Sequence, residues 1–137
     1  MNINLGKVEG THHFFPVHVF YNMTDAGGIV YHANYLRICE EARVSMCIMM
    51  KLGPGDVNGE FVVRSAHLDY MKPAKYGDDL VIETWYENAR RTSAEAVQII
   101  RRGEDIIAKV RLVVVFVSLD GTFTPTPIPE SYKVRDQ

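Results

Sequence analysis

The chain has 137 residues, of which 47% are hydrophobic and 23% are charged, a composition close to that of ordinary globular domains. Its length suits one domain with one core over residues 1–137, since such domains typically run about 100 to 150 residues. The formal net charge of −2 argues against a nucleic-acid binder, and no apolar run approaches the roughly 18 residues of a transmembrane segment.

The first residues and the two cysteines bear on the cellular compartment. Residues 1–15 lack the apolar core of a signal peptide, so we expect a cytoplasmic protein. Cys39 and Cys47 fall in one predicted helix, where their separation is about 12 Å, beyond the roughly 7 Å that a disulfide spans. We therefore expect two free thiols that pack as small hydrophobic side chains.

The first predicted element is a strand over residues 14–21, FFPVHVFY, in which apolar residues alternate. Pro16 places this strand near an edge of a sheet or at a strand start, because proline cannot donate to a ladder. The stretch TDAGG, residues 24–28, follows and predicts a sharp turn, since glycine adopts backbone angles that other residues resist. Asp25 lies on that turn.

A single long helix is predicted over residues 33–52. Its apolar positions recur near the helical period, and Gly53 follows as a C-terminal stop. The expected apolar face consists of Leu36, Cys39, Ala42, Met46, Met49 and Met50. Because the segment MCIMM has almost no polar face, we expect the C-terminal half of this helix to be covered on most sides.

The rest of the chain reads as strands with short connections. A loop is expected over residues 53–59, and strands over 61–72, 78–89, 92–102 and 105–118. Such short connections predict that consecutive strands pair antiparallel as a meander. The proline-rich residues 121–137 are expected to be extended and irregular.

Together these elements predict an α+β domain in which an antiparallel five-stranded sheet wraps around one long central helix. The free sheet edges invite pairing with a second copy, so we expect a homodimer or homotetramer.

Two blocks of sequence resemble a known family. The stretch YNMTDAGGIVYHANYLRICEEAR, residues 21–43, and the stretch FVVRSAHLDYMKPAKYGDDL, residues 61–80, resemble the hot-dog fold acyl-CoA thioesterases of the 4-hydroxybenzoyl-CoA thioesterase type, in particular the YbgC-like branch. The resemblance covers roughly residues 14–129. One departure is that the branch commonly has two acidic residues where this chain has Asn22 and Met23.

The resemblance implies roles for residues around the glycine turn. Asp25 would be the catalytic carboxylate, either as nucleophile or as general base on water, and Tyr21 would orient it. The backbone N–H groups of Tyr31 and His32 would form the oxyanion hole, because the first amides of a helix are unpaired and lie at its positive end. The His32 imidazole would protonate the leaving thiolate. Taken without the resemblance, an Asp before two glycines usually stabilises a turn.

The resemblance also implies where coenzyme A would bind. Arg90, Arg91 and Thr92 would contact its phosphates, although a basic pair at a hairpin is often simply solvated. Residues 63–65, which are Val63, Arg64 and Ser65, would lie at the boundary with a neighbouring subunit. We expect no cofactor beyond the coenzyme A of the substrate and no metal, because the histidines lack zinc-site spacing. A serine hydrolase is disfavoured because no G-x-S-x-G elbow is present.

The expected function is hydrolysis of an acyl-CoA to the free acid and coenzyme A, with acyl carrier protein as a second possible carrier of the acyl group. The alternative from another class is a non-catalytic acyl-CoA or acyl-carrier-protein binding module. Among enzymes, the rival is a hot-dog dehydratase or hydratase, which needs a further histidine and acid pair.

Overall fold

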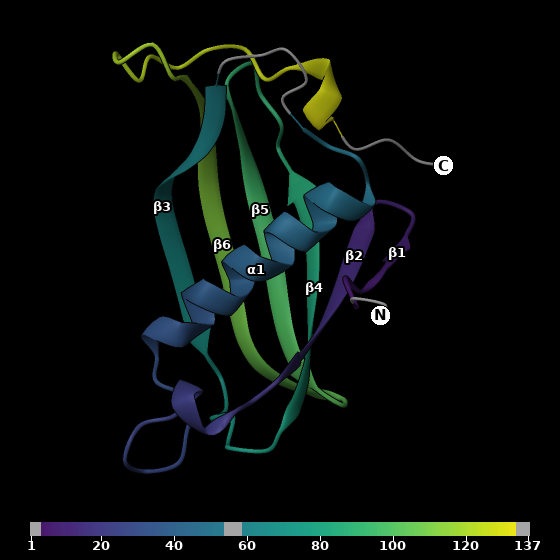
Figure 1. Cartoon of the computed structure of the whole chain (residues 1–137), viewed down its shortest axis with the longest axis vertical. Helices are drawn as coiled ribbons and strands as arrows, with labels where there is room; N and C mark the ends of the chain where they lie inside the picture. The colour runs from purple at the N-terminus through teal and green to yellow at the C-terminus, as the bar shows by residue number, and fades with distance from the viewer. Residues whose placement is uncertain (1–3, 54–58, 134–137) are drawn as a thin grey trace.

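The computed structural model describes residues 4–53 and 59–133, and it shows one helix lying across one face of an antiparallel sheet (Figure 1). The strands are β1 (Lys7–Glu9), β2 (His12–His18), β3 (Gly59–Tyr70), β4 (Asp79–Glu87), β5 (Ser93–Arg102) and β6 (Asp105–Ser118). The helix is α1 (Ala33–Met49), and two 3-10 turns are η1 (Tyr21–Met23) and η2 (Glu130–Tyr132). The predicted α+β class is confirmed. Most of the loop expected over 53–59 lies outside the described residues.

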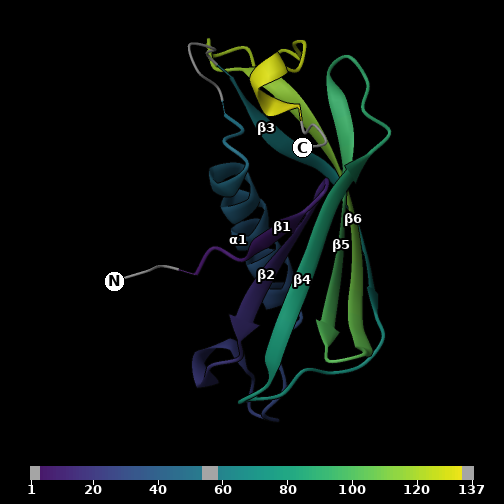
Figure 2. The ribbon, with the colours of Figure 1, turned by 90° about the vertical axis from the view of Figure 1, so that its right-hand side faces the viewer.

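Within the described residues the sheet has six strands, in the order β1-β2-β4-β5-β6-β3, so the predicted count of five is wrong. The extra strand, β1, pairs with the start of β2, with Lys7 opposite Phe14. Three residues are too few for an alternating pattern to emerge, which is why the sequence did not indicate this strand. In the side view, β1 and β2 lie in front of α1 at one end of the sheet (Figure 2).

Strand β3 corrects the prediction that every strand pairs with the next. Strands β4, β5 and β6 do form a meander, but β3 pairs with β6, with Gly59 opposite Ser118 and Tyr70 opposite Ala108. The connection over residues 71–78 therefore crosses the end of the sheet and passes two strands before β4 begins. This arrangement leaves the outer edge of β3 unpaired.

The strand predicted over residues 14–21 is shifted. Strand β2 begins at His12 and ends at His18, and Tyr21 lies in η1 after the chain has left the sheet. Pro16 pairs only with Val81 of β4, beyond the reach of the short β1. Its predicted place near a sheet edge is confirmed.

The buried face of α1 agrees with the predicted one in part. Cys39, Ala42 and Met46 are buried as predicted, whereas Leu36 and Met49 are 40% and 37% exposed. Tyr35 and Ile38 are buried as well, although the predicted face did not include them. The helix ends at Met49, and Lys51, rather than Gly53, takes a left-handed conformation, with a φ of 55°. The sequence pattern could not tell buried from exposed apolar positions on this helix, because apolar residues occur on most of its faces.

The C-terminal half of α1 is also more open than expected. Val44 and Ile48 are 52% and 57% exposed, so the prediction that this half is covered on most sides is wrong for the single chain.

A polar network lies in the core between α1 and the sheet. The buried Gln98 donates from Nε2 to the Cys39 carbonyl at 2.9 Å and to the Thr84 hydroxyl at 3.0 Å. Its Oε1 accepts a hydrogen bond of 2.9 Å from the Arg43 guanidinium. Because these groups are paired with one another, their burial is compensated, and the network fixes α1 over β4 and β5.

The end of the chain crosses the end of the sheet as an extended segment, here called the C-terminal strap and comprising residues 124–132. Its backbone is bonded to several elements, with Thr126 N–H donating to the Phe116 carbonyl and Ile128 N–H donating to the Arg91 carbonyl, each at 2.9 Å. The Tyr132 ring lies 5.0 Å from that of Phe61. Within the described residues, the irregular tail that the prolines predict is confirmed, apart from the short turn η2.

Both cysteines are free thiols, as predicted, with Cys39 buried and Cys47 half-buried. Burial raises the pKa of the Cys39 thiol to about 12, so it is neutral at physiological pH. Across residues 4–53 and 59–133, no helix has the length and apolar content needed to cross a membrane.

Candidate active site

Asp25 sits on a turn that its own side chain stabilises. The Gly27 N–H donates to Asp25 Oδ1 at 2.8 Å, and the Gly28 N–H donates to the Asp25 carbonyl at 3.0 Å. Gly28 has a φ of 79°, a left-handed conformation that suits glycine. The carboxylate is exposed, and its second oxygen accepts no hydrogen bond from any described residue. One carboxylate oxygen is therefore fixed and the other is open to a ligand.

The turn is held in place by the segment after β3. The Val30 N–H donates to the Ala74 carbonyl at 2.9 Å, and the Tyr76 N–H donates to the Gly28 carbonyl at 3.1 Å. Within the turn, the Asp25 N–H donates to the Ile29 carbonyl at 3.0 Å. The carboxylate thus projects from a small hydrogen-bonded ladder rather than from a free loop.

The start of α1 leaves the N–H of His32 unpaired within the described residues. The Tyr31 N–H donates to the Met23 carbonyl at 3.0 Å, so it is already used within the chain, contrary to the expectation that it faces substrate. The N–H of His32, the N-cap residue, makes no hydrogen bond to any described residue, and no side chain caps the helix. Of the two amides expected at an oxyanion hole, only that of His32 remains available.

Asn34 fixes the geometry of this region, although the sequence assigned it no role. Its side-chain Nδ2 donates to the Met23 carbonyl at 2.8 Å, which ties the first turn of α1 to η1. The same carbonyl accepts the Tyr31 N–H. An asparagine in the first turn of a predicted helix, where its side chain can bond to nearby backbone, was the signal that could have indicated it.

A pocket of about 280 Å³ lies beside the start of α1. It is lined by Ile29, Val30, His32, Tyr35, Tyr70, Met71, Lys72 and Pro73. The Tyr35 hydroxyl accepts a hydrogen bond of 3.2 Å from the Ala74 N–H, and burial raises the pKa of this phenol. His32 reaches the pocket, but Asp25 does not line it, so this pocket does not enclose the carboxylate.

Tyr21 is not brought to the Asp25 carboxylate. Its side chain is 75% exposed and its ring lies edge-on to that of Tyr76, with centroids 5.9 Å apart. Its hydroxyl makes no hydrogen bond to any residue that the structure describes.

The structure brings together Arg64, expected to bind substrate at the boundary with a neighbouring subunit, and Arg90, expected to contact the phosphates of coenzyme A. Both line a pocket of about 430 Å³ with Asn88, Ser93 and Glu95, among other residues. Val63 is 48% exposed, and the β3–β6 register shifts between Val63 and Ser65. Arg91 and Thr92 do not line this pocket, although Arg91 is exposed nearby in the same hairpin.

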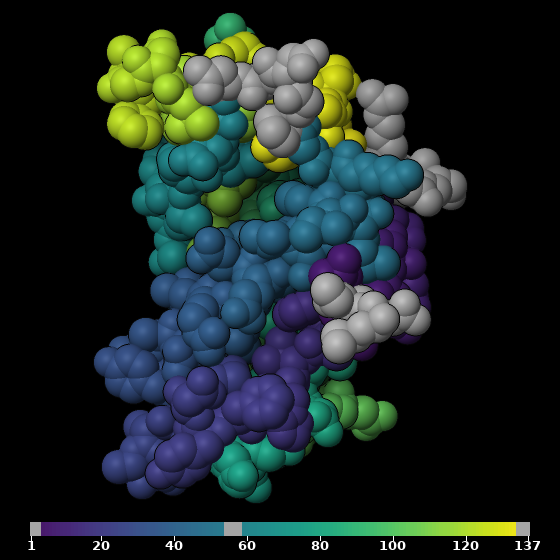
Figure 3. Space-filling view, viewed as in Figure 1, coloured from purple at the N-terminus to yellow at the C-terminus, as the bar shows by residue number. Residues whose placement is uncertain are grey.

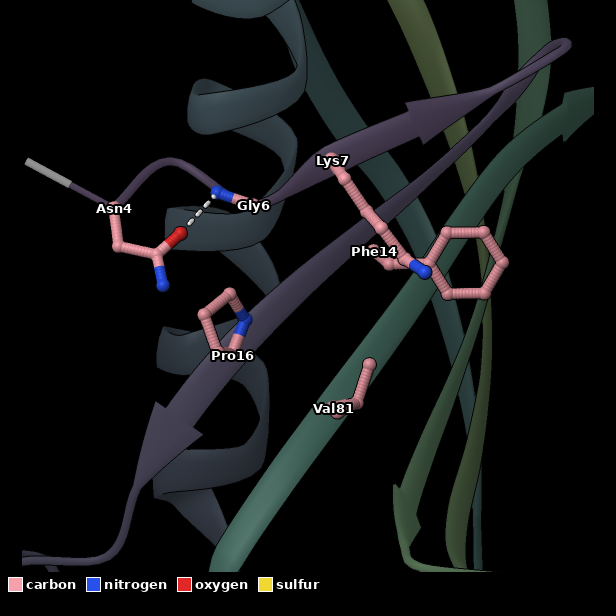
Figure 4. A pocket seen from close by; sticks show the side chains of 6 residues that line it. All are labelled: Asn4, Gly6, Lys7, Phe14, Pro16 and Val81. Carbon is pink, nitrogen blue, oxygen red and sulfur yellow. Dashed lines mark hydrogen bonds between the residues drawn. The ribbon is translucent and has the colours of Figure 1, made fainter.

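A further hollow, of about 260 Å³, lies at the other edge of the sheet between β1, β2 and β4 (Figure 4). Lys7 lies over the Phe14 ring at 5.6 Å, and Asn4 caps the Gly6 N–H at 2.9 Å. None of the residues expected to take part in catalysis lines it. Over residues 4–53 and 59–133, no group of three His, Cys, Asp or Glu side chains converges as metal ligands.

Known proteins resemble this chain in sequence. The profile of the thioesterase superfamily matches residues 27–109. The acyl-CoA thioesterase YbgC of Haemophilus influenzae is 33% identical over 87% of this chain and 90% of its own length. The acyl-CoA thioester hydrolase YbgC of Escherichia coli O157:H7 is 34% identical over 85% of this chain and 90% of its own length. A YbgC from Helicobacter pylori is 41% identical, but the match spans only 55% of that protein and 53% of this chain.

Solved structures share the fold. A probable thioesterase from Bartonella henselae superposes with a TM-score of 0.77 at 25% identity, over 87% of this chain and 98% of that one. The 1,4-dihydroxy-2-naphthoyl-CoA thioesterase of Synechocystis superposes with a TM-score of 0.80 at 21% identity, over 88% of this chain and 92% of that one. These similarities confirm both the hot-dog fold and the family resemblance drawn from residues 21–43 and 61–80. The chain belongs to the thioesterase superfamily.

Proposed function

We propose that this chain is an acyl-CoA thioesterase, which hydrolyses the thioester to a free acid and coenzyme A. The proposal rests on two groups that lie near each other in the sequence. The Asp25 carboxylate is exposed and only one of its oxygens accepts a hydrogen bond from the described residues, and the His32 N–H at the start of α1 donates none to them. Its relatives named acyl-CoA thioesterase YbgC support the same reaction.

The reaction needs an oxygen attack on the thioester carbon and a donor for the oxyanion. The carbonyl oxygen accepts the His32 N–H, which the positive end of α1 reinforces. Asp25 either removes a proton from the attacking water or attacks the carbon itself to form an anhydride that water then hydrolyses. The C–S bond breaks, and the thiolate of coenzyme A takes up a proton, for which the His32 imidazole is the nearest candidate along the chain. No cofactor is required.

The active unit in this proposal is a homodimer, and a homotetramer of two dimers is compatible with it. Asp25 does not line a pocket of its own subunit, and the outer edge of β3 is unpaired, with Val62 and Val63 exposed. Pairing of this edge with a second copy would bury those side chains and supply a wall for the acyl group.

The Arg64–Arg90 pocket is the proposed site for the phosphates of coenzyme A. Guanidinium groups suit phosphate because they donate parallel hydrogen bonds with a permanent charge. Arg91 and Thr92, in the same hairpin, would contribute at its rim. The same route would accommodate the phosphopantetheine of acyl carrier protein, and the setting proposed for this activity is the cytoplasm.

The test is thiol release from short aliphatic, long aliphatic and aromatic acyl-CoAs by the wild type, Asp25→Asn and the control Asp69→Asn, which changes an exposed carboxylate on β3. We expect release with the wild type and the control and almost none with Asp25→Asn. If the folded wild type binds acyl-CoA but releases no thiol from any of them, the alternative of a binding module is favoured instead.

A further inference from the structure

A further cavity, of about 340 Å³, lies at the C-terminal end of α1, the opposite end of the helix from the Asp25 turn. Cys47 and Leu52 line it from the helix side, Phe61 and Tyr86 from the sheet, and Ile128 and Tyr132 from the C-terminal strap. In the space-filling view it appears as a recess between α1 and β3, with green strand atoms at its floor (Figure 3). Neither Asp25 nor His32 lines it, although Arg90, assigned above to the phosphates of coenzyme A, does.

The walls of this cavity are held in place without a ligand. The Phe61 ring packs edge-on against Phe116 at 5.2 Å and against Tyr132 at 5.0 Å. The part of the C-terminal strap that lines the cavity is held by two backbone hydrogen bonds. The Ile128 N–H donates to the Arg91 carbonyl at 2.9 Å, and the Gly53 N–H donates to the Ser131 carbonyl at 3.2 Å. The cavity is therefore preformed, as small-molecule sites usually are.

The polar groups inside the cavity are neutral. The Tyr86 hydroxyl makes no hydrogen bond to any described residue, and burial raises its pKa to about 12. Burial also raises the pKa of the Cys47 thiol. An apolar molecule can contact these groups without leaving a charge unpaired.

The charges lie at the rim and are positive. Arg90 lines the cavity and makes no ion pair within residues 4–53 and 59–133. Lys133 also lines it, with Nζ 2.6 Å from Glu130 Oε1. An apolar interior with a cationic rim is complementary to an amphiphilic anion, and a volume of about 340 Å³, near the lower end of the about 300–1,000 Å³ typical of such pockets, limits its body to a short chain or one ring.

We propose that this cavity binds a small monocarboxylic acid, whose apolar body lies among Phe61, Tyr86 and Tyr132 and whose carboxylate lies against Arg90 and Lys133. This site is additional to the proposed hydrolytic site. Because Arg90 also lines the Arg64–Arg90 pocket, a bound acid would neutralise a cation that the phosphates of coenzyme A would contact.

Cys47 supplies a direct readout on the full-length protein. It lines the cavity and is half-buried, whereas Cys39 is buried and serves as an internal reference. The rate of Cys47 alkylation by N-ethylmaleimide would be followed by mass spectrometry with increasing octanoate, acetate or octyl phosphate. We expect saturable protection by octanoate and none by acetate, which lacks the apolar body. Protection by octyl phosphate at lower concentration than octanoate would overturn the assignment to a carboxylic acid.

Three variants locate the site. Ala94→Leu fills the cavity and should weaken protection at least about tenfold, while Lys133→Gln should weaken it about three- to fivefold because a rim charge is partly screened. Lys109→Gln, which removes an exposed charge outside this cavity, should leave protection unchanged.

Asp25→Asn separates this proposal from the proposed hydrolysis, because it should abolish thiol release while leaving the octanoate protection of Cys47 intact. The proposal is overturned if octanoate gives the wild type no saturable protection, if Asp25→Asn loses protection, or if Lys133→Gln and Lys109→Gln behave alike. The last comparison stands even if Ala94→Leu does not fold.

Discussion

The Gly27 N–H donates a hydrogen bond of 2.8 Å to Asp25 Oδ1, so the carboxylate is oriented by the turn that follows it. An asparagine can keep this bond through its side-chain oxygen but cannot act as a base. Asp25→Asn should therefore fold normally and lose about 10²- to 10⁴-fold in kcat, the usual contribution of a general base. Steady-state thiol release measures the loss of kcat, and thermal unfolding of the same preparation checks that the variant folds normally. An unchanged kcat would remove Asp25 from the mechanism.

Gly28 and Gly27 form a matched pair for the role of the turn. Gly28 has a φ of 79°, where a Cβ costs roughly 1 kcal/mol or more, although no atom lies within 4 Å of the position of the added Cβ. Gly27→Ala introduces no such strain but places Cβ 3.3 Å from Asp25 Oδ1. We expect Gly28→Ala to lower the free energy of unfolding and Gly27→Ala chiefly to lower kcat. Chemical denaturation and kinetics of both variants would show whether the two effects separate in this way.

Asn34 should act as a positioning residue. Its loss removes the 2.8 Å bond to the Met23 carbonyl, which also accepts the Tyr31 N–H. Asn34→Ala and Asn34→Asp should both lower stability by about 1 kcal/mol and lower kcat more than they change KM, because neither can donate this bond. Asn22→Ala, an exposed change in η1, is the control. A KM effect without a kcat effect would place Asn34 in substrate binding instead.

His13 makes stability depend on pH. Burial lowers its pKa, although the bond to the Leu5 carbonyl at 2.7 Å opposes this shift, and its Nδ1 has no partner. As pH falls below about 6.5, the unfolded chain binds a proton that the folded chain resists, so the free energy of unfolding decreases until the folded histidine also protonates. Denaturant unfolding at pH 7.5 and 5.5 should show this loss in the wild type and in His67→Gln, an exposed control, but a smaller one in His13→Gln. Equal pH dependence in all three would contradict it.

Arg43 and Gln98 should be energetically coupled. Removing Arg43 leaves the buried Gln98 Oε1 without its 2.9 Å donor, at a cost of about 1–3 kcal/mol. Arg43→Met and Gln98→Met should each destabilise the protein, and the double variant should be less destabilised than their sum by about 0.5–3 kcal/mol. Unfolding free energies for the four proteins provide this cycle, and strict additivity would show that the two side chains act independently.

The sequence predicted the local elements of this fold better than their placement. The apolar residues alternate in residues 105–118 and recur at helical spacing in 33–52. Each pattern is local, because the positions of a segment's own apolar side chains indicate which of its faces is buried. The pairing of β3 with β6 depends on the whole sheet, since a connection as short as residues 71–78 can lead to a neighbouring strand or, as here, to a strand three places away.

The same limit applies to the site. The Asp25 turn was predictable because two glycines and an acid specify it locally. The turn η1 was not predictable, because no periodic pattern indicates it. It is η1 that places the Met23 carbonyl where it accepts the Tyr31 N–H and the Tyr21 ring beside that of Tyr76. Arg64 and Arg90 meet because β3 and the β4–β5 hairpin reach the same end of the sheet, a relation between distant segments.

The pairing of β3 with β6 has a consequence for folding during synthesis. Strand β3 leaves the ribosome before β4, β5 and β6, yet among the strands that the structure describes it pairs only with β6, the last one made. The hairpins that join β4, β5 and β6 can form as soon as each emerges, whereas β3 must wait until they are complete, because closing such a long loop is slow. Until then both of its edges are unpaired, so a nascent chain carries its greatest risk of aggregation in the strand that follows the helix.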